Sequence, residues 1–195
     1  MDIQFFNIQK TLNDDNIFNI NAERKYREAE DYFFYFDRAD LALKLLKSAL
    51  KLSATHVKSM KLIADIYYSN GKIKKAFDYY SQAAALQPCD VSVLSSLAVV
   101  CEALNKNENA LDFINLAFEH YSSKNIKIYS QMCDLKFLLL LKMKKYSEAK
   151  KFFDKINKTI PYDEFKMVTV ARNSETLQKK LLLKERMENL HIKVV

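Results

Sequence analysis

The sequence has 195 residues and a formal net charge of +7, with 49% hydrophobic and 28% charged residues. This balance predicts a folded, soluble protein rather than a disordered one. There are only one glycine and two prolines, whereas a β-rich fold needs many glycine or proline turns and a phosphate-binding loop needs clustered glycines. Both are therefore excluded, and helices joined by short polar turns remain.

Residues 1–22 form the first expected element. Large apolar side chains lie on both sides of a polar stretch, Asn13–Asn16, that predicts a turn; they are Phe5, Phe6, Ile8, Leu12, Ile17 and Phe18. The terminal unit of a repeat array exposes an apolar face that needs a cover. We therefore expect residues 1–22 to cap the first helix pair, with an arm for dimerisation or partner binding as the alternative.

Three segments of equal length then follow one another without a gap: 23–56, 57–90 and 91–124. In the middle copy Ala76, Tyr80 and Ala83 lie at i, i+4 and i+7, which share one face of a helix. The same small–large–small pattern recurs one period earlier and one period later, at Ala42, Leu46 and Ala49 and at Ala110, Ile114 and Ala117. A second amphipathic segment precedes each triplet, and in the middle copy it turns at Gly71. Each copy predicts two helices joined by a tight turn, and such pairs bury their apolar faces by stacking.

A fourth copy, residues 130–163, lies further along the chain than this period predicts. It carries Ala149, Phe153 and Ile156, and we expect the inserted residues in the Ser122–Ile128 stretch. Its first half contains the apolar run Phe137–Leu141, which predicts a helix buried on both sides. A subunit interface at this run is the alternative.

Residues 164–195 are expected to form basic capping helices. The basic excess is confined to the C-terminal part: residues 1–121 hold 14 basic and 16 acidic residues, and residues 122–195 hold 17 and 8. Near the end, Leu183, Met187, Leu190 and Val194 recur at helical spacing beside lysines and arginines. The alternative to a cap is an amphipathic basic helix that contacts an acidic partner, a membrane surface or RNA.

Residues 57–90 resemble the tetratricopeptide repeat, and the matching positions are Ile63, Ala64, Tyr67, Gly71, Ala76, Tyr80, Ala83 and Pro88. Residues 23–56 and 91–124 match with substitutions, among them Cys101 where tyrosine is usual, and residues 130–163 match well only in their second half. The resemblance implies an all-α fold: a right-handed α-α superhelix of three regular helix hairpins plus a degenerate fourth, between N- and C-terminal capping helices. It also implies a non-catalytic module, an adaptor or chaperone-like scaffold, that binds a partner protein. The size and the N-terminal arm are similar to those of the small chaperones of type III secretion translocators.

In this family the first helix of each repeat lines a concave groove that holds a peptide or a partner helix. The resemblance places the groove at Arg24, Arg27, Asp31, Phe34, Tyr35, Lys58, Lys61, Asp65, Tyr68, Ser95 and Val99. The basic–acidic–aromatic order in the first two repeats suits an extended peptide with apolar anchors. The alternative is that Arg27–Asp31 and Lys61–Asp65 are i,i+4 ion pairs on a solvated face. Family members that clamp a chaperone's C-terminal carboxylate need basic residues and asparagines at positions where only Arg27 is compatible here.

Few residues suggest chemistry. None of His56, His120 and His191 has another histidine or a cysteine at metal-ligand spacing, and His56 and His120 fall near expected helix ends. Three widely spaced cysteines argue against a disulfide framework and for inert, core-facing thiols in a reducing compartment. We therefore expect no enzyme activity, no metal and no cofactor. The start lacks a signal-peptide pattern and the longest apolar run is too short to span a bilayer, so we expect a cytoplasmic protein. Nucleic-acid binding by the basic C-terminal part and homodimeric assembly remain alternatives.

Overall fold

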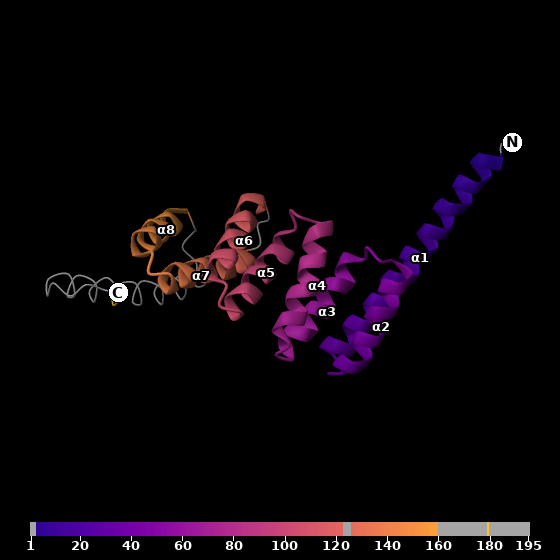
Figure 1. The fold of residues 1–195 in the computed structure, drawn as a ribbon, viewed down its shortest axis with the longest axis horizontal. Helices are drawn as coiled ribbons and strands as arrows, with labels where there is room; N and C mark the ends of the chain where they lie inside the picture. Colours follow the sequence, from indigo (N-terminus) through magenta and orange to yellow (C-terminus); the bar gives the residue numbers. More distant parts are fainter. Residues whose placement is uncertain (1–2, 123–125, 160–178, 180–195) are drawn as a thin grey trace. The chain divides into compact units, whose positions relative to one another are not determined.

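The computed structural model describes residues 3–122, 126–159 and 179, and all the regular structure in these ranges is α-helical. The all-α expectation is therefore confirmed. The chain forms two compact units, one up to Val100 and one from Cys101 onward, and the boundary lies within α5. In chain order (Figure 1), the helices are α1 Ile3–Phe34, α2 Ala39–Leu52, α3 Val57–Ser69, α4 Ile73–Leu86, α5 Val91–Ala103, α6 Asn107–His120, α7 Ile126–Lys142 and α8 Tyr146–Thr159.

The repeat spacing is confirmed by the second helix of each pair. Helices α2, α4 and α6 have 14 residues each and begin at Ala39, Ile73 and Asn107, so their starting points are evenly spaced by the period that the sequence predicts. The displacement of the fourth copy arises mostly in α7, which has 17 residues where α5 has 13. Helix α7 begins at Ile126, so its extra turn falls within or beside the stretch where the sequence indicates an insertion.

Each helix pair turns through one residue with a left-handed backbone. These residues are Asp37, Gly71, Asn105 and Lys144, with φ of 51°, 70°, 59° and 58°. At Gly71 the turn closes by two hydrogen bonds, from Gly71 N to Tyr68 O (2.9 Å) and from Lys72 N to Tyr67 O (2.8 Å). This pattern satisfies the last carbonyl groups of α3 and reverses the chain. Glycine adopts the conformation at little cost, whereas the other three residues adopt it with some strain.

The small–large–small triplets form the core, as predicted. All six alanines of the three regular copies are fully buried, and Leu46, Tyr80 and Ile114 between them are at most 3% exposed. In the fourth copy Ala149 and Ile156 are buried, while Phe153 is partly exposed. The alanines let the neighbouring helix approach closely and the larger residue fills the remaining space. In the first unit, α1 packs against α2, α2 against α3 and α3 against α4; in the second, α6 packs against α7 and α7 against α8.

The N-terminal arm differs from the prediction. Instead of breaking at Asn13–Asn16, α1 runs without interruption from Ile3 to Phe34 and continues past the end of α2 toward the N terminus (Figure 1). Asparagine and aspartate disfavour a helix interior by only a few tenths of a kcal/mol each, about 0.7 at most. They therefore do not end a helix that the flanking residues support. The division at residues 22 and 163 and the handedness of the superhelix stay predictions, and the expected helices of residues 164–195 lie outside the described residues.

Two burial predictions are wrong in detail. In the run Phe137–Leu141, Leu138 is 43% exposed, although the other four side chains are at most 4% exposed. A helix packed on two neighbours still leaves one direction open, and Leu138 points there. Cys101 and Cys133 are buried as expected, but Cys89 is exposed because it lies in the connection between α4 and α5.

Candidate functional site

The first unit contains a hollow of about 580 Å³ between α1, α3 and the chain segments that precede α3 and α5. We call it the α1–α3 hollow. Its lining combines aromatic, charged and small polar side chains: Asn19, Tyr26, Glu30, Phe34, Ser53, Thr55, His56, Val57, Lys58, Lys61, Leu62, Asp65, Gln87 and Asp90. A volume of this size accommodates a few side chains of a partner.

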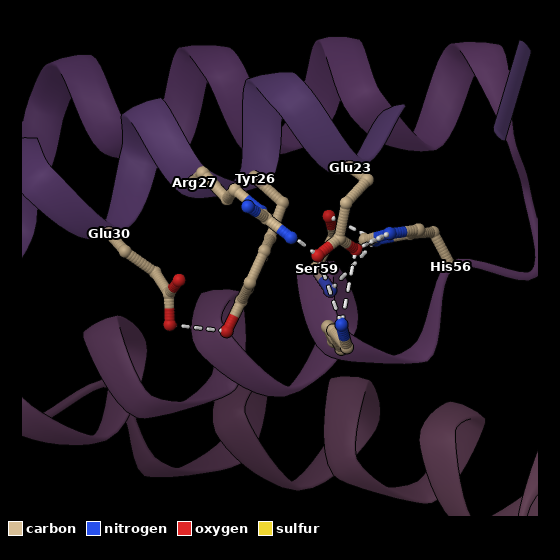
Figure 2. A network of polar contacts seen from close by, with 7 residues as sticks. Glu23, Tyr26, Arg27, Glu30, His56 and Ser59 are labelled. Carbon is tan, nitrogen blue, oxygen red and sulfur yellow. Dashed lines mark hydrogen bonds and ion pairs between the residues drawn. The ribbon is translucent and has the colours of Figure 1, made fainter. Parts of the chain in front are cut away.

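A polar network centred on Glu23 joins α1 to the start of α3 (Figure 2). Lys58 Nζ lies 3.0 Å from Glu23 Oε1, His56 Nε2 lies 3.2 Å from Oε2, and Arg27 Nε lies 3.4 Å from Oε1. The hydrogen bond from Lys58, followed by that from His56, holds the pKa of the Glu23 carboxyl below its ordinary value, although partial burial opposes the shift. Glu23 does not itself line the α1–α3 hollow, but its carboxylate ties two lining residues, His56 and Lys58, to α1.

His56 is the N-cap of α3 as well as a partner of Glu23. Its Nδ1 accepts a hydrogen bond from the backbone N–H of Ser59 at 3.3 Å and lies 2.8 Å from the Ser59 hydroxyl. Its Nε2 is then the atom that donates to Glu23. One imidazole thus satisfies a free amide of the helix end and bridges to α1, which confirms the position near a helix end that the sequence predicts.

Tyr26 and Glu30 follow Glu23 along α1 and form one wall of the α1–α3 hollow. The Tyr26 hydroxyl donates a 2.5 Å hydrogen bond to Glu30 Oε1, its ring lies 5.7 Å from that of His56, and Lys58 Nζ lies 5.8 Å from the ring centre. Burial raises the pKa of the Tyr26 hydroxyl, and the hydrogen bond to Glu30 and the charges of Glu30, Glu23 and Asp65 raise it further. The hydroxyl therefore stays protonated and remains a donor.

The opposite wall comes from α3. Asp65 accepts a hydrogen bond from the Tyr80 hydroxyl of α4, and Lys61 Nζ donates to Ser92 Oγ at 2.5 Å. Burial raises the pKa of the Asp65 carboxyl, while the Tyr80 hydroxyl and the charge of Lys61 oppose the shift. At the rim, Asp90 Oδ1 accepts from the backbone N–H groups of Ser92 (2.8 Å) and Val93 (3.0 Å) and so caps α5.

The structure brings only part of the expected groove together. Of the predicted residues, Phe34, Lys58, Lys61 and Asp65 line the α1–α3 hollow. Arg24 and Arg27 line a second, shallower hollow of about 570 Å³ beside Glu23. Asp31, Tyr35 and Tyr68 are exposed and Ser95 and Val99 are partly exposed, and none of these five lines either hollow. Whether the predicted residues bind a partner stays a prediction.

Among the described side chains, neither of the i,i+4 ion pairs of the alternative interpretation, Arg27–Asp31 and Lys61–Asp65, forms. Arg27 pairs with Glu23, four residues earlier, rather than with Asp31. Lys61 bonds to Ser92, and Asp65 bonds to Tyr80. Lys61 and Asp65 thus find partners on other helices while Arg27 pairs along its own helix, so the spacing along one helix does not by itself decide the pairing.

Sequence reasoning missed Glu23, Tyr26, Glu30 and His56 as parts of the site. The repeat pattern could have predicted the contact between Glu23 and His56, because they are the first and last residues of the first repeat copy. Stacked copies bring such ends together. Nothing in the sequence indicated that Glu30 would be open to the hollow. Within the described ranges, no group of three His, Cys, Asp or Glu side chains could hold a metal ion.

Comparison with solved structures adds evidence on the fold. A tetratricopeptide repeat protein from Parabacteroides merdae ATCC 43184 matches with a TM-score of 0.68 and 18% identity over 87% of this chain and 65% of its own. MamA matches with a TM-score of 0.61 and 14% identity over 82% and 81%. The first tetratricopeptide domain of Spaghetti (RPAP3), bound to the HSP90 peptide SRMEEVD, matches with a TM-score of 0.55 and 17% identity over 62% and 94%.

The chain has a tetratricopeptide-type fold. No protein-family model matches the sequence, and no curated protein matches it either. At these identities the likeness shows the fold alone, so the tetratricopeptide-type chain inherits no partner from its neighbours. In the part that the structure describes, no helix is long and apolar enough to cross a membrane.

Proposed function

We propose that this protein is a non-catalytic interaction module that holds a segment of a partner protein in the α1–α3 hollow. The observation that carries the proposal is the lining of the hollow. A solvent-open aromatic side chain, Phe34, lies in the same cavity as half-buried charged groups from α1 and α3. Interfaces concentrate binding energy on aromatic anchors surrounded by polar groups, and this hollow supplies both.

The structural neighbours support the same class of function. The Spaghetti (RPAP3) domain is described bound to a peptide. Its peptide ends in an acidic segment, whereas the hollow of this chain carries its own carboxylates, so the two would not take the same ligand. An adaptor or chaperone that recognises an internal segment fits this chain better than a clamp for a C-terminal carboxylate.

A matched pair of substitutions tests the proposal. Phe34 is 63% exposed and lines the hollow, while Phe36 is 65% exposed and does not. Affinity-tagged wild type, Phe34→Ala and Phe36→Ala are used to capture proteins from the cells that naturally produce the chain. We expect Phe34→Ala to lose about tenfold or more of the captured partner, because burying a phenylalanine contributes roughly 1.5–3 kcal/mol. Phe36→Ala should retain it.

A photocrosslinking amino acid at each position gives a second readout. Position 34 should crosslink to the partner and position 36 should not. If both substitutions leave the same proteins at the same yield, or if position 36 crosslinks as strongly as position 34, the hollow is not the binding site. The basic C-terminal part, which is the alternative site for nucleic acid or an acidic partner, is described only at residues 122, 126–159 and 179. This alternative stays a prediction, as does homodimeric assembly.

A further inference from the structure

The charges of the α1–α3 hollow are unbalanced. Its lining carries three carboxylates, Glu30, Asp65 and Asp90, and two ammonium groups, Lys58 and Lys61. Lys58 is already paired with Glu23 at 3.0 Å, so only Lys61 is left to offset the three carboxylates. Among the described side chains, no lysine or arginine nitrogen forms an ion pair with any of these three. The lining of the hollow therefore has a surplus of negative charge.

Glu30 is the carboxylate best placed to meet a partner. Among the described residues, its one hydrogen bond is the one that Oε1 accepts from the Tyr26 hydroxyl, which leaves Oε2 able to accept from a ligand. Asp90, by contrast, is engaged in capping α5. Asp65 lies on the facing helix in the same lining, and the charges of both Glu30 and Asp65 raise the pKa of the Tyr26 hydroxyl. The charges of both carboxylates therefore act in the part of the hollow that holds the Tyr26 hydroxyl.

Phe34 supplies the apolar half of this subsite. It follows Glu30 by four residues on α1, so the two side chains lie on one face, one turn apart. The Phe34 ring is held edge-on by Phe33 at 4.9 Å yet remains 63% exposed. In a lysine or arginine side chain the apolar stem and the charged head are separated by about the distance between Phe34 and Glu30, one helical turn. Both lysine and arginine can contact an aromatic face.

On the basis of the proposed function, we infer that the partner segment inserts a lysine or arginine side chain, whose head contacts Glu30 and Asp65 and whose stem lies on Phe34. Charge complementarity favours this occupant over an acidic or purely apolar segment. It also separates this hollow from those that recognise acidic peptide ends.

The inference is tested with end-blocked nonapeptide pools in which one fixed position is lysine, arginine, norleucine or glutamate and the others are randomised. Binding to the 195-residue chain is measured by fluorescence anisotropy at low salt. We expect the lysine and arginine pools to bind about tenfold more tightly than the norleucine pool, and the glutamate pool to bind least. The preference should weaken as the salt concentration rises.

Two substitutions localise the effect. Glu30→Gln keeps an oxygen that accepts the Tyr26 hydroxyl but removes the charge, and it should reduce the preference for lysine over norleucine to about threefold or less. Asp31→Asn removes a neighbouring exposed carboxylate that does not line the hollow, and it should leave the preference unchanged. Circular dichroism confirms that both variants fold.

A lysine or arginine pool that binds no better than the norleucine pool overturns the inference, as does a preference that survives Glu30→Gln. The proposed function is judged separately by partner capture with Phe34→Ala and Phe36→Ala. Loss of the partner on Phe34→Ala without any preference for a basic side chain leaves the hollow as a binding site and removes only its basic ligand.

Discussion

Substitution of Glu23 by glutamine isolates the contribution of its charge. Lys58 and Arg27, which pair with Glu23, have side chains 62% and 75% exposed, and such exposed ion pairs contribute about 0–1 kcal/mol each. His56 is only 12% exposed, and a hydrogen bond to a charged group contributes about 1.5–3 kcal/mol. Because glutamine keeps one oxygen acceptor, we expect Glu23→Gln to lower the free energy of unfolding by about 1–2 kcal/mol at pH 7.

The sign of the pH dependence follows from the lowered pKa of Glu23. In the unfolded chain the carboxyl has its ordinary pKa of 4.5, and in the folded protein it is lower. The stability that Glu23 contributes is therefore present above pH 4.5 and is lost as the pH falls through the folded pKa. Wild type and Glu23→Gln should differ most near neutral pH and converge below pH 4.5.

Urea unfolding followed by circular dichroism at several pH values measures this difference. Glu28→Gln is the matched control, because Glu28 is an exposed carboxylate on the same helix that does not belong to the network. We expect the control to change the free energy of unfolding by less than about 0.5 kcal/mol at any pH. A Glu23→Gln difference that does not depend on pH, or one no larger than that of Glu28→Gln, would refute the assignment of the network.

Four further outcomes are expected. Asp65→Asn should unfold at a higher urea concentration than wild type at pH 7, because burial raises the pKa of the Asp65 carboxyl and so makes its ionised form unfavourable in the folded protein. The variant should lose this advantage as the pH falls through the folded pKa of Asp65 toward 3.8, because the folded wild type then takes up a proton and gains stability. Gly71→Ala should lower the free energy of unfolding by about 1–2 kcal/mol through backbone strain alone, since a Cβ there meets no atom within 4 Å. Lys144→Gly should have the opposite effect, about 0.5–1 kcal/mol in favour of the folded state, because φ at Lys144 is 58°. Cys89 should react with a thiol reagent in the folded protein, whereas Cys133 should react only after unfolding, because it is buried and burial raises its pKa to about 12.

The repeat period and the core could be predicted from sequence because close helix packing needs small residues at fixed places. Only alanine, glycine or serine allows two helices to approach closely, so Ala42, Ala76 and Ala110 carry a signal that survives changes at most other positions. All three are fully buried. The turn residues carried a weaker signal, because Gly71 alone among the four is a glycine.

The N-terminal part of α1 has a structure that the residue pattern did not predict. Whether a helix continues through Asn13–Asn16 depends on the sum of the small helix propensities of many residues. The polar side chains of this stretch predicted a turn, but the backbone stays helical. The polar network centred on Glu23 was not predicted from the sequence, for a different reason. The hydrogen bond between His56 and Glu23 joins residues 33 apart, and its formation depends on how two helices are placed rather than on either local pattern.

The composition of the hollow differs from the repeat pattern at two positions of α1. Tyr26 and Glu30 stand one repeat period before Met60 and Ala64, which are buried in α3 at 6% and 0% exposure. Helix α3 packs against both α2 and α4, so a charge at its Ala64 position would be buried without a partner. Among the described helices, α1 packs mainly against α2 and less against α3, and its corresponding position holds Glu30 half-buried, with the Tyr26 hydroxyl as its donor. A position that the repeat pattern assigns to the core is thereby open to the hollow in α1. For this reason the groove residues transferred from the pattern include Lys61 and Asp65 of α3 but not Glu30 of α1.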